Sequence, residues 1–206
     1  MQILVLGATG RVGSHIVANA IEDQHHVTVL VRNPEKCQTH DKNLTIIQGN
    51  VLNQEDIIRA IHGANVVISA LNTDGTNTLS ESMPLIIDAM LKEGIERIIT
   101  IGTAGILQSR LSPSVLRYQS SESRRKSTRA AEEHHRVYLL LQESTLEWTI
   151  VCPTYLPDGD HVGEYRVERN VLPEGGTVIS VRDTAEFTYN QIKDDSNIKS
   201  RVGISY

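Results

Sequence analysis

Short apolar runs alternate with segments of helical pattern along most of the chain. The apolar runs predict β-strands at Gln2–Leu6, His26–Val31, Leu44–Gln48, Asn65–Ser69, Arg97–Ile101 and Trp148–Cys152. The segments between them, where apolar residues recur at helical spacing, predict helices at Val12–Glu22, Gln54–Ile61, Leu79–Glu93 and Thr128–Glu143. Because short strands that alternate with helices are typical of a parallel sheet covered on both faces, we expect a three-layer α/β fold. Right-handed crossovers then make the parallel sheet doubly wound.

Polar residues and a glycine mark the ends of two of these helices. Asn53 is a suitable N-cap, and Glu55 and Asp56 follow in the first turn, where the helix dipole favours acidic side chains. Gly94 comes directly after Glu93 and predicts the end of the longer helix.

The basic segment, residues 108–129, departs from this alternation. Its one acidic residue is Glu122, and it has no clear periodicity until its end. Its six basic residues are Arg110, Arg117, Arg124, Arg125, Lys126 and Arg129. Two interpretations stay open: a long solvated loop, or a mobile flap that carries cations to an anionic substrate.

The segment Tyr155–Gly176 is the second departure and is rich in Gly, Asp and Pro. We expect a loop that contains an extended piece at Glu164–Glu168. A strand at Thr177–Ser180 and a helix that begins near Asp183 are expected to follow it.

Composition is typical of a soluble globular protein. With 206 residues, 39% hydrophobic and 22% charged, the chain is expected to form one domain over residues 1–206. The net charge of −5 argues against nucleic acid as a partner. Cys37 and Cys152 have no metal or disulfide pattern and are expected to be reduced. The first apolar run lacks a basic lead and no stretch approaches about 18 apolar residues, so neither a signal peptide nor a membrane span is expected, and cytoplasm is the default location.

Three glycines stand between the first predicted strand and the first predicted helix. Gly7 lets the chain turn sharply, Gly10 lets backbone approach a phosphate, and Gly13 lets the helix pack close to the sheet. The helix N-terminus directs unpaired N–H groups at an anion, so the order of elements predicts a dinucleotide-binding Rossmann fold rather than a purely structural turn. The candidate pyrophosphate-binding residues of this turn are Gly7, Thr9, Gly10, Arg11, Val12 and Gly13.

Ligands of such sheets bind at the carboxyl ends of the strands, which adds further candidates. Asn50 and Val51 follow the third strand and are candidates for contact with adenine, although loop structure explains them equally well. The remaining candidates for contact with the cofactor are Ala70, Leu71, Asn72, Thr103, Pro153 and Thr154.

Arg32 follows the second strand, at the place where an acid would bind the free ribose hydroxyl of NAD. An arginine there suits a 2′-phosphate, so we expect NADP(H) rather than NAD(H), with a solvated surface arginine as the alternative. Arg11 is expected to add to the same positive pocket.

The proton relay that short-chain reductases usually carry, Tyr-x-x-x-Lys, is absent. The residues four places after Tyr118, Tyr138 and Tyr155 are Glu122, Gln142 and Gly159. Either the protein does no redox chemistry, or its acceptor takes hydride without an acid from the enzyme, as an extended conjugated acceptor does. His134 and His135 are adjacent and point about 100° apart on a helix, so we expect no metal site there.

From end to end, the chain resembles the atypical short-chain dehydrogenase/reductase group that includes flavin reductases of the biliverdin reductase B type. The resemblance covers nearly the whole chain and becomes more specific after residue 100. It rests on 7–10 (GATG), 28–32 (TVLVR), 49–52 (GNVL), Thr103, 142–144 (QES), Pro153, 163–167 (GEYRV), 178–180 (VIS) and Asp183.

This resemblance implies a monomer-sized Rossmann domain that binds NADPH and passes hydride to a flavin or related acceptor. We expect a monomer or a weak homo-oligomer. Carried over by position, Arg32 would meet the 2′-phosphate, Thr103 would lie near the nicotinamide, and His134 matches a histidine of the family. Thr154 stands where biliverdin reductase B has a histidine that faces the substrate, which weakens a claim for tetrapyrrole reduction. Thr103, His134 and Tyr155 are the candidate catalytic residues, each with a structural alternative as a cap, a surface side chain or a packing residue.

Two functions remain open on the sequence. The first is an NADPH-dependent reductase of a flat conjugated acceptor such as a flavin, a quinone or a tetrapyrrole-like molecule. The second is a non-catalytic NAD(P)-sensing regulator of the nitrogen-metabolite-repression type, which the missing relay supports equally. NADP binding without turnover would distinguish the second from the first.

Overall fold

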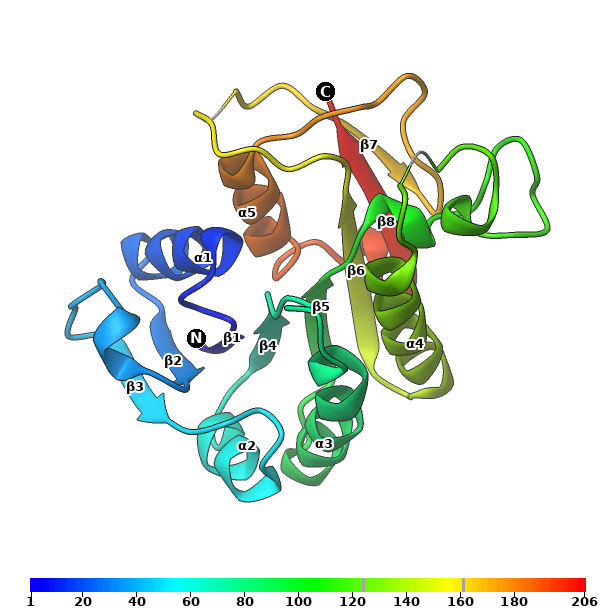
Figure 1. The fold of residues 1–206 in the computed structure, drawn as a ribbon. Helices are drawn as coiled ribbons and strands as arrows, with labels where there is room; N and C mark the ends of the chain where they lie inside the picture. Colours follow the sequence, from blue (N-terminus) through cyan, green and yellow to red (C-terminus); the bar gives the residue numbers. More distant parts are fainter. Residues whose placement is uncertain (124, 161) are drawn as a thin grey trace.

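One mostly parallel sheet extends through the molecule (Figure 1). The computed structural model describes residues 1–123, 125–160 and 162–206. Those residues form eight strands in the order β3-β2-β1-β4-β5-β6-β8-β7, and all neighbours are parallel except β7 and β8. The strands are β1 (Gln2–Leu6), β2 (His26–Val31), β3 (Leu44–Gln48), β4 (Val66–Ser69), β5 (Arg97–Ile101), β6 (Glu147–Pro153), β7 (Arg166–Arg169) and β8 (Ser200–Ser205).

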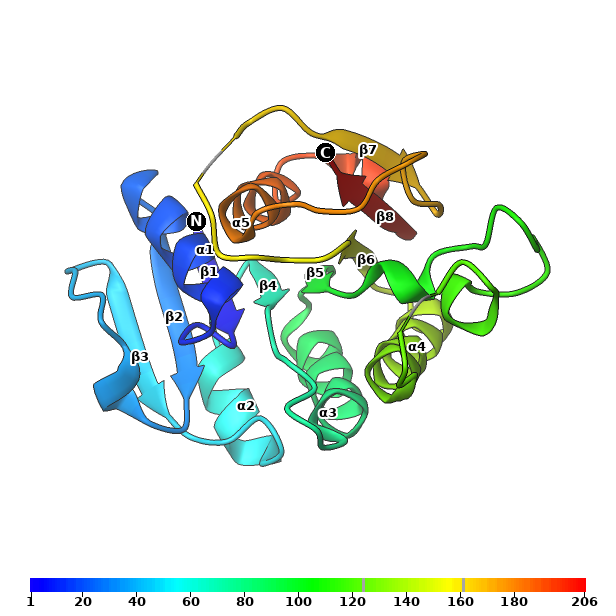
Figure 2. The ribbon, with the colours of Figure 1, turned by 45° about the horizontal axis from the view of Figure 1, so that its top comes forward.

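Helices cover both faces of this sheet and make it the middle of three layers (Figure 2). One face carries α1 (Arg11–Glu22) and α5 (Val181–Asn190), and the other carries α2 (Gln54–Ile61), α3 (Thr78–Glu93) and α4 (Arg129–Glu143). Short 3₁₀ turns lie at η1 (Pro34–Lys36), η2 (Ala104–Ile106), η3 (Arg117–Gln119) and η4 (Asp195–Asn197). The predicted α/β, doubly wound, three-layer class is confirmed.

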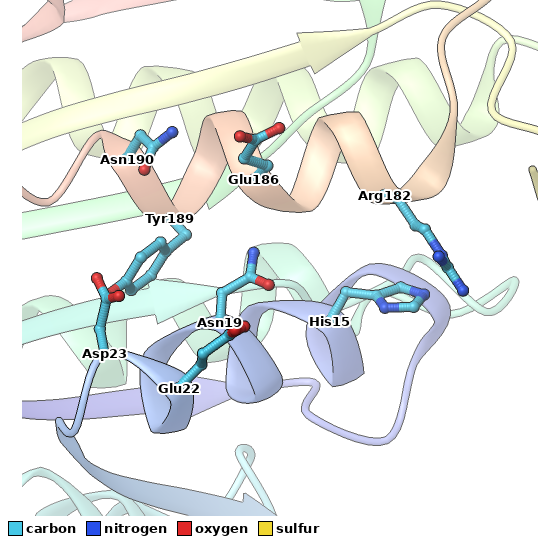
Figure 3. A pocket seen from close by; sticks show the side chains of 8 residues that line it. All are labelled: His15, Asn19, Glu22, Asp23, Arg182, Glu186, Tyr189 and Asn190. Atoms are coloured by element: carbon cyan, nitrogen blue, oxygen red, sulfur yellow. The ribbon is translucent and has the colours of Figure 1, made fainter. Parts of the chain in front are cut away.

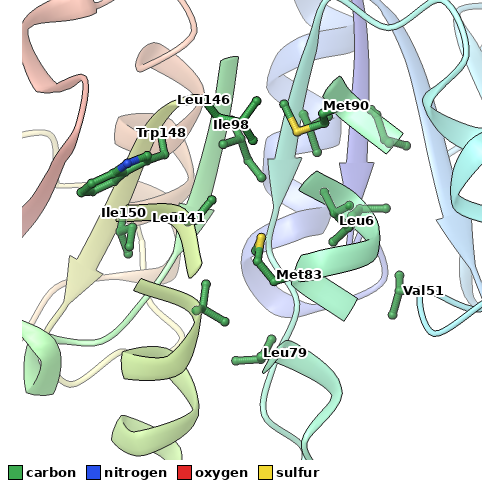
Figure 4. Close-up of a cluster of buried hydrophobic side chains, with 14 of the residues drawn as sticks. Leu6, Val51, Leu79, Met83, Met90, Ile98, Leu141, Leu146, Trp148 and Ile150 are labelled. Atoms are coloured by element: carbon green, nitrogen blue, oxygen red, sulfur yellow. The ribbon is translucent and has the colours of Figure 1, made fainter. Parts of the chain in front are cut away.

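Each face of the sheet packs a separate apolar core. Beneath α2, α3 and α4, Met83 and Leu141 pack with Leu6, Ile98 and Trp148 (Figure 4). The core beneath α1 and α5 contains Ile16, Val29 and Ala185. Strands buried on both faces need near-continuous apolar runs, which explains why strands such as β1, β4 and β5 were readable from the sequence.

The six predicted strands and four predicted helices are present, and each end lies within one residue of its prediction. Two predicted helix ends are also confirmed by their geometry. The Asn53 side chain accepts a hydrogen bond from the Asp56 amide at 3.1 Å. Gly94 ends α3 with a φ of 70°, in the left-handed region.

The C-terminal third differs from the prediction in two places. The strand expected at Thr177–Ser180 is wrong: the structure has an isolated bridge between Tyr155 and Val178, and Ser180 caps α5 by accepting from the Asp183 amide. β8 was not predicted, because its apolar positions are interrupted by a buried arginine, Arg201, and by a glycine, Gly203, where a Cβ would lie 2.3 Å from the Val171 oxygen. The extended piece is present as β7, whose span begins and ends later than expected.

The described part of the basic segment folds onto itself. Gln108 and Leu116 form an antiparallel bridge, and η3 follows. Glu122 binds Arg117 at 3.2 Å and accepts from the Arg110 amide at 3.0 Å. The single acid of this segment therefore binds the side chain of Arg117 and the backbone of Arg110. Arg124 lies outside the described residues.

Candidate functional site

A groove opens at the carboxyl ends of β1 to β4, beside the point where the order of strands reverses. Its volume is about 340 Å³. We call it the glycine-turn groove; it is lined by Gly7, Thr9, Gly10, Leu30, Val31, Arg32, Gly49, Asn50, Val51, Leu52, Ala70, Leu71, Asn72, Asp74 and Thr78. Because the first, second, third and fourth strands all end here, residues far apart in sequence meet in one groove.

Gly7 and Gly13 fix the shape of the turn. Gly7 has a φ of 78°, and a Cβ there would lie 2.4 Å from the carbonyl oxygen of Ala70. A Cβ at Gly13 would lie 2.2 Å from the carbonyl oxygen of Gly7. The first contact brings β1 and the loop after β4 together, and the second brings α1 against the turn. Only glycine fits both positions without movement of backbone.

The N-terminus of α1 meets the groove without a side-chain cap. Gly10 is the N-cap in extended conformation, and the first turn of α1 contains no acidic residue. The amides of that turn are therefore available to an anion, which the positive end of the helix dipole attracts. Thr9 and Gly10 line the groove, whereas Val12 and Gly13 are buried in the packing of α1.

Arg32 lies at the rim of the glycine-turn groove at the end of β2, and its side chain is 73% exposed. Its guanidinium is 3.9 Å from the Asp74 carboxylate across the groove. Asn50 and Asn72 both line the groove but each binds neighbouring backbone: Asn50 accepts from the Leu52 amide at 3.1 Å, and Asn72 from the Thr73 amide at 2.8 Å. Arg32 is thus the groove's cation, and it has a weak carboxylate partner.

Arg11 does not join Arg32. Its guanidinium turns to the loop after β6, where it donates to the Leu156 carbonyl and to the Asp158 carboxylate, each at 3.0 Å. The sequence could not indicate this partner, because Asp158 is 147 residues away.

A larger cavity of about 800 Å³ lies farther along the same edge of the sheet, after β5 and β6. Among the residues that line it are Thr103, Pro153, Thr154 and Tyr155, all predicted from the sequence, so we call it the Thr103 cavity. The Thr103 hydroxyl caps η2 and accepts from the Gly105 amide at 3.4 Å. The Thr154 hydroxyl oxygen is buried and has no hydrogen-bond partner within the described part of the chain. The Tyr155 side chain, in contrast, is 61% exposed.

The lining of the Thr103 cavity also has a basic part. Arg117, Arg125 and Lys126 line it together with Glu122. Glu122 pairs with Arg117, and neither Arg125 nor Lys126 has a polar partner among the described residues. A chain with a net charge of −5 therefore presents unpaired cations to this cavity.

His134 and His135 have different surroundings on α4. His134 is half-buried and is not among the residues that line either cavity, and burial lowers its pKa to about 4. The neighbouring His135 makes a hydrogen bond of 3.1 Å between its Nδ1 and the hydroxyl of Tyr118, which lines the Thr103 cavity. Tyr118 was missed in the sequence because its partner is not four residues away but on another element.

Another polar groove lies between α1 and α5, and none of the predicted site residues lines it (Figure 3). Asp23 accepts a hydrogen bond from the Tyr189 hydroxyl at 2.6 Å and lies 3.7 Å from Lys193. These contacts link the ends of the two helices, so the polar residues have a structural role there.

The described residues contain no cluster of three or more His, Cys, Asp or Glu side chains that could hold a metal ion. Within the same residues, every helix is too short or too polar to span a membrane. Cys37 and Cys152 are both free and buried, and burial raises the pKa of Cys152 to about 12.

Comparison with known proteins gives a family and a fold. Residues 7–195 match the model of an NAD(P)H-binding family. A segment of 106 residues is 32% identical to the photosystem II assembly factor Ycf39 of Synechocystis and covers 48% of this chain but 32% of that one. The chain thus matches about a third of the length of this longer relative.

Solved structures match over the whole chain. A protein of Streptococcus pneumoniae described as a candidate NADH-flavin reductase has a TM-score of 0.83 and 24% identity, over 100% of this chain and 99% of that one. A short-chain dehydrogenase/reductase of Veillonella parvula in complex with NADP has a TM-score of 0.77 and 21% identity, over 100% and 94%. At these identities the likeness shows the shared Rossmann fold.

Proposed function

Because the chain belongs to the NAD(P)H-binding family, we propose that it is an NADPH-dependent reductase that passes hydride to a flat conjugated acceptor. Flavins, quinones and tetrapyrrole-like molecules form this class of acceptor. The observation that carries the proposal is that the glycine-turn groove and the Thr103 cavity lie along one edge of one sheet. An extended dinucleotide would then place its adenosine in the first and its nicotinamide at the second.

The residues of the turn fit a dinucleotide. Gly10 lets phosphate oxygens approach backbone, because the single atom near a Cβ there is the Gly7 oxygen at 3.2 Å. The uncapped first turn of α1 supplies amide donors. At the other end, the unpartnered hydroxyl of Thr154 could bind the nicotinamide carboxamide. Asn50, Val51, Ala70, Leu71 and Asn72 would contact the nucleotide between these ends.

Arg32 supports NADP(H) over NAD(H). Its exposed guanidinium lies at the end of β2, where a 2′-phosphate would be bound. Arginine suits phosphate because its planar fork donates two parallel hydrogen bonds. The NADP complex of the Veillonella parvula protein, which shares this fold, adds support.

The Thr103 cavity supports a flat acceptor. It is large enough for a multi-ring molecule beside a nicotinamide, and Thr103 and Pro153 would form the wall behind the two rings. When bound, the reduced nicotinamide supplies the hydride; the chain's own part is to hold the two rings in contact. Tyr155, which is exposed at the cavity, would cover the acceptor. His134 lies outside the lining, so its role would be in the packing of α4 rather than in contact with the acceptor.

Steady-state oxidation of NADPH tests the proposal. Riboflavin, FMN, FAD and menadione are each offered with and without the protein, so that direct reaction of NADPH with the acceptor is subtracted. We expect turnover with at least one acceptor and a preference for NADPH over NADH. Absence of turnover above background across the panel would overturn the proposal.

A regulator that senses dinucleotides is the second candidate. The assembly-factor name of the relative Ycf39 is the observation that favours it. The same experiment separates the two, because a sensor binds NADPH, as seen by quenching or enhancement of its fluorescence, and does not oxidise it.

A further inference from the structure

The wall of the Thr103 cavity contains a hydrogen-bonded tyrosine–histidine pair. Tyr118 comes from η3 and lines the cavity, and its hydroxyl lies 3.1 Å from Nδ1 of His135 on α4. A Cβ at Gly105, two residues after Thr103, would lie 3.5 Å from the Cβ of Tyr118, so this tyrosine packs against the turn that carries Thr103. The pair therefore lies beside the place proposed for the nicotinamide.

Aromatic contacts and one buried arginine hold the pair in place. The rings of Tyr118 and His135 meet edge-on at 5.8 Å, and His135 stacks on Tyr138 at 6.3 Å with 22° between the planes. The guanidinium carbon of Arg201 lies 4.3 Å from the centre of the Tyr138 ring. Arg201 is 5% exposed and donates to the Ile106 carbonyl in the turn after Thr103. Contacts from η3, α4 and β8 thus hold the imidazole in one orientation.

Arg201 on β8 is also the buried charge that faces the pair. Burial and Arg201 both lower the pKa of His135, which favours the neutral imidazole. Of the other charged groups that line the cavity with Tyr118, Arg117 and Glu122 pair with each other, and Arg125 and Lys126 have no polar partner among the described residues. A neutral imidazole protonated on Nδ1 donates to the phenol oxygen and leaves the phenol proton directed elsewhere.

We propose that Tyr118 donates the proton that accompanies hydride transfer, and that His135 is the residue that positions and reprotonates it. This inference rests on the proposed reductase function. A bound reduced nicotinamide would supply the hydride to the acceptor, and the O–H bond of Tyr118 would break as its proton joins an acceptor oxygen. The imidazole takes a proton from solvent on Nε2 and returns its Nδ1 proton to the tyrosinate, and proton exchange with solvent then restores the tautomer protonated on Nδ1. The net consumption is one NADPH and one solvent proton for each acceptor.

The pair takes the place of the missing Tyr-x-x-x-Lys relay, with a partner for the tyrosine that comes from another helix.

The pair should also affect different acceptors to different extents. A quinone needs one hydride and one proton to become a neutral hydroquinone, whereas a flavin that receives hydride can remain an anion at neutral pH. We therefore infer that a quinone-type oxygen acceptor depends on this pair more than a flavin does.

Tyr118→Phe and His135→Gln test the inference with menadione and riboflavin as paired acceptors. Positioned proton donors contribute about 10²-fold or more, so we expect Tyr118→Phe to lower kcat for menadione by about 10²-fold, with KM changed little. The fall for riboflavin should be far smaller. His135→Gln should lower kcat for menadione about 10-fold, and the solvent isotope effect on the wild-type kcat should be lost in Tyr118→Phe.

Tyr189→Phe is the matched control, because it removes a bonded phenol hydroxyl between α1 and α5, on the other face of the sheet. It should leave both activities unchanged. Equal losses for both acceptors in Tyr118→Phe, or no loss, would overturn the inference, while the absence of wild-type turnover would instead overturn the proposed function. A readout without turnover is the ¹⁵N resonance of His135 Nδ1, which should shift in folded Tyr118→Phe; an unshifted resonance also contradicts the pair.

Discussion

Arg11 in the glycine turn and Asp158 in the loop after β6 form an ion pair of 3.0 Å across the edge of the sheet. The same guanidinium nitrogen donates to the Leu156 carbonyl. The two side chains are 58% and 80% exposed, so the pair contributes little to stability. Its importance is positional, because it turns Arg11 away from the groove where a pyrophosphate would lie.

We expect Asp158→Asn to bind NADPH a few-fold more tightly, because Arg11 is released to meet the phosphates. The free energy of unfolding should change by less than about 1 kcal/mol. Glu174→Gln makes the same change of charge on an exposed side chain and serves as the control. Fluorescence titration measures the affinity; equal dissociation constants in Asp158→Asn and the wild type would show that Arg11 does not reach the cofactor.

A comparison of Gly7 with Gly75 separates the effect of crowding around a Cβ from the effect of a positive φ. Their φ values are 78° and 79°, but a Cβ at Gly7 meets the Ala70 carbonyl while a Cβ at Gly75 meets nothing within 4 Å. Gly75→Ala should therefore cost about 1 kcal/mol, from φ alone. Gly7→Ala should cost more than about 3 kcal/mol, because backbone must move. Urea unfolding at constant m-value measures both, and similar losses would contradict the crowding at Gly7.

Arg32 and Asp74 should have opposite effects on the choice of cofactor. Arg32→Asp removes a charge-assisted hydrogen bond to a 2′-phosphate, worth about 1.5–3 kcal/mol. The ratio of NADH to NADPH dissociation constants should accordingly fall about 10-fold or more. Asp74→Asn removes the carboxylate 3.9 Å from Arg32 and should raise that ratio. If neither variant changes the ratio, the arginine is a solvated surface residue.

Arg125 and Lys126 should recognise an anionic group on the acceptor. FMN and riboflavin share one ring system and differ by a phosphate, so their kcat/KM ratio isolates this contribution. The double variant Arg125→Gln and Lys126→Gln should lower the ratio of FMN to riboflavin about 10-fold. Lys92 lies in the last turn of α3, where it pairs with Asp88, and Lys92→Gln should not affect this ratio. An unchanged ratio in the double variant would mean that the basic part of the lining is only solvated.

The sequence predicted those features that depend on local pattern. Buried strands such as β4 read as apolar runs, Asn53 and Gly94 mark helix ends, and Gly7 marks the turn, because each depends on residues close in the chain. β8 was missed because its apolar positions are interrupted by Arg201, which is accommodated by contacts with Tyr138 and Ile106.

Site geometry was less predictable where a partner comes from another element. The turn of Arg11 toward Asp158 and the bond between Tyr118 and His135 both join distant segments. No periodicity or spacing encodes such a pair, since it depends on how loops after different strands pack together. Strand-end residues such as Arg32 and Thr103 could be predicted, because parallel strands bring their carboxyl ends to one edge.

His134 makes stability depend on pH in a direction that can be tested. Burial lowers its pKa from 6.5 to about 4, so between these values the unfolded chain binds more protons than the folded one. Stability must therefore fall as pH decreases below 6.5, by about 2 kcal/mol at pH 5 from this residue alone. His134→Gln should remove that part of the difference between unfolding free energies at pH 7 and pH 5, whereas His40→Gln, on an exposed side chain, should retain it. Because carboxylates titrate alike in both variants, an equal difference in the two would mean that His134 is not buried as a neutral imidazole.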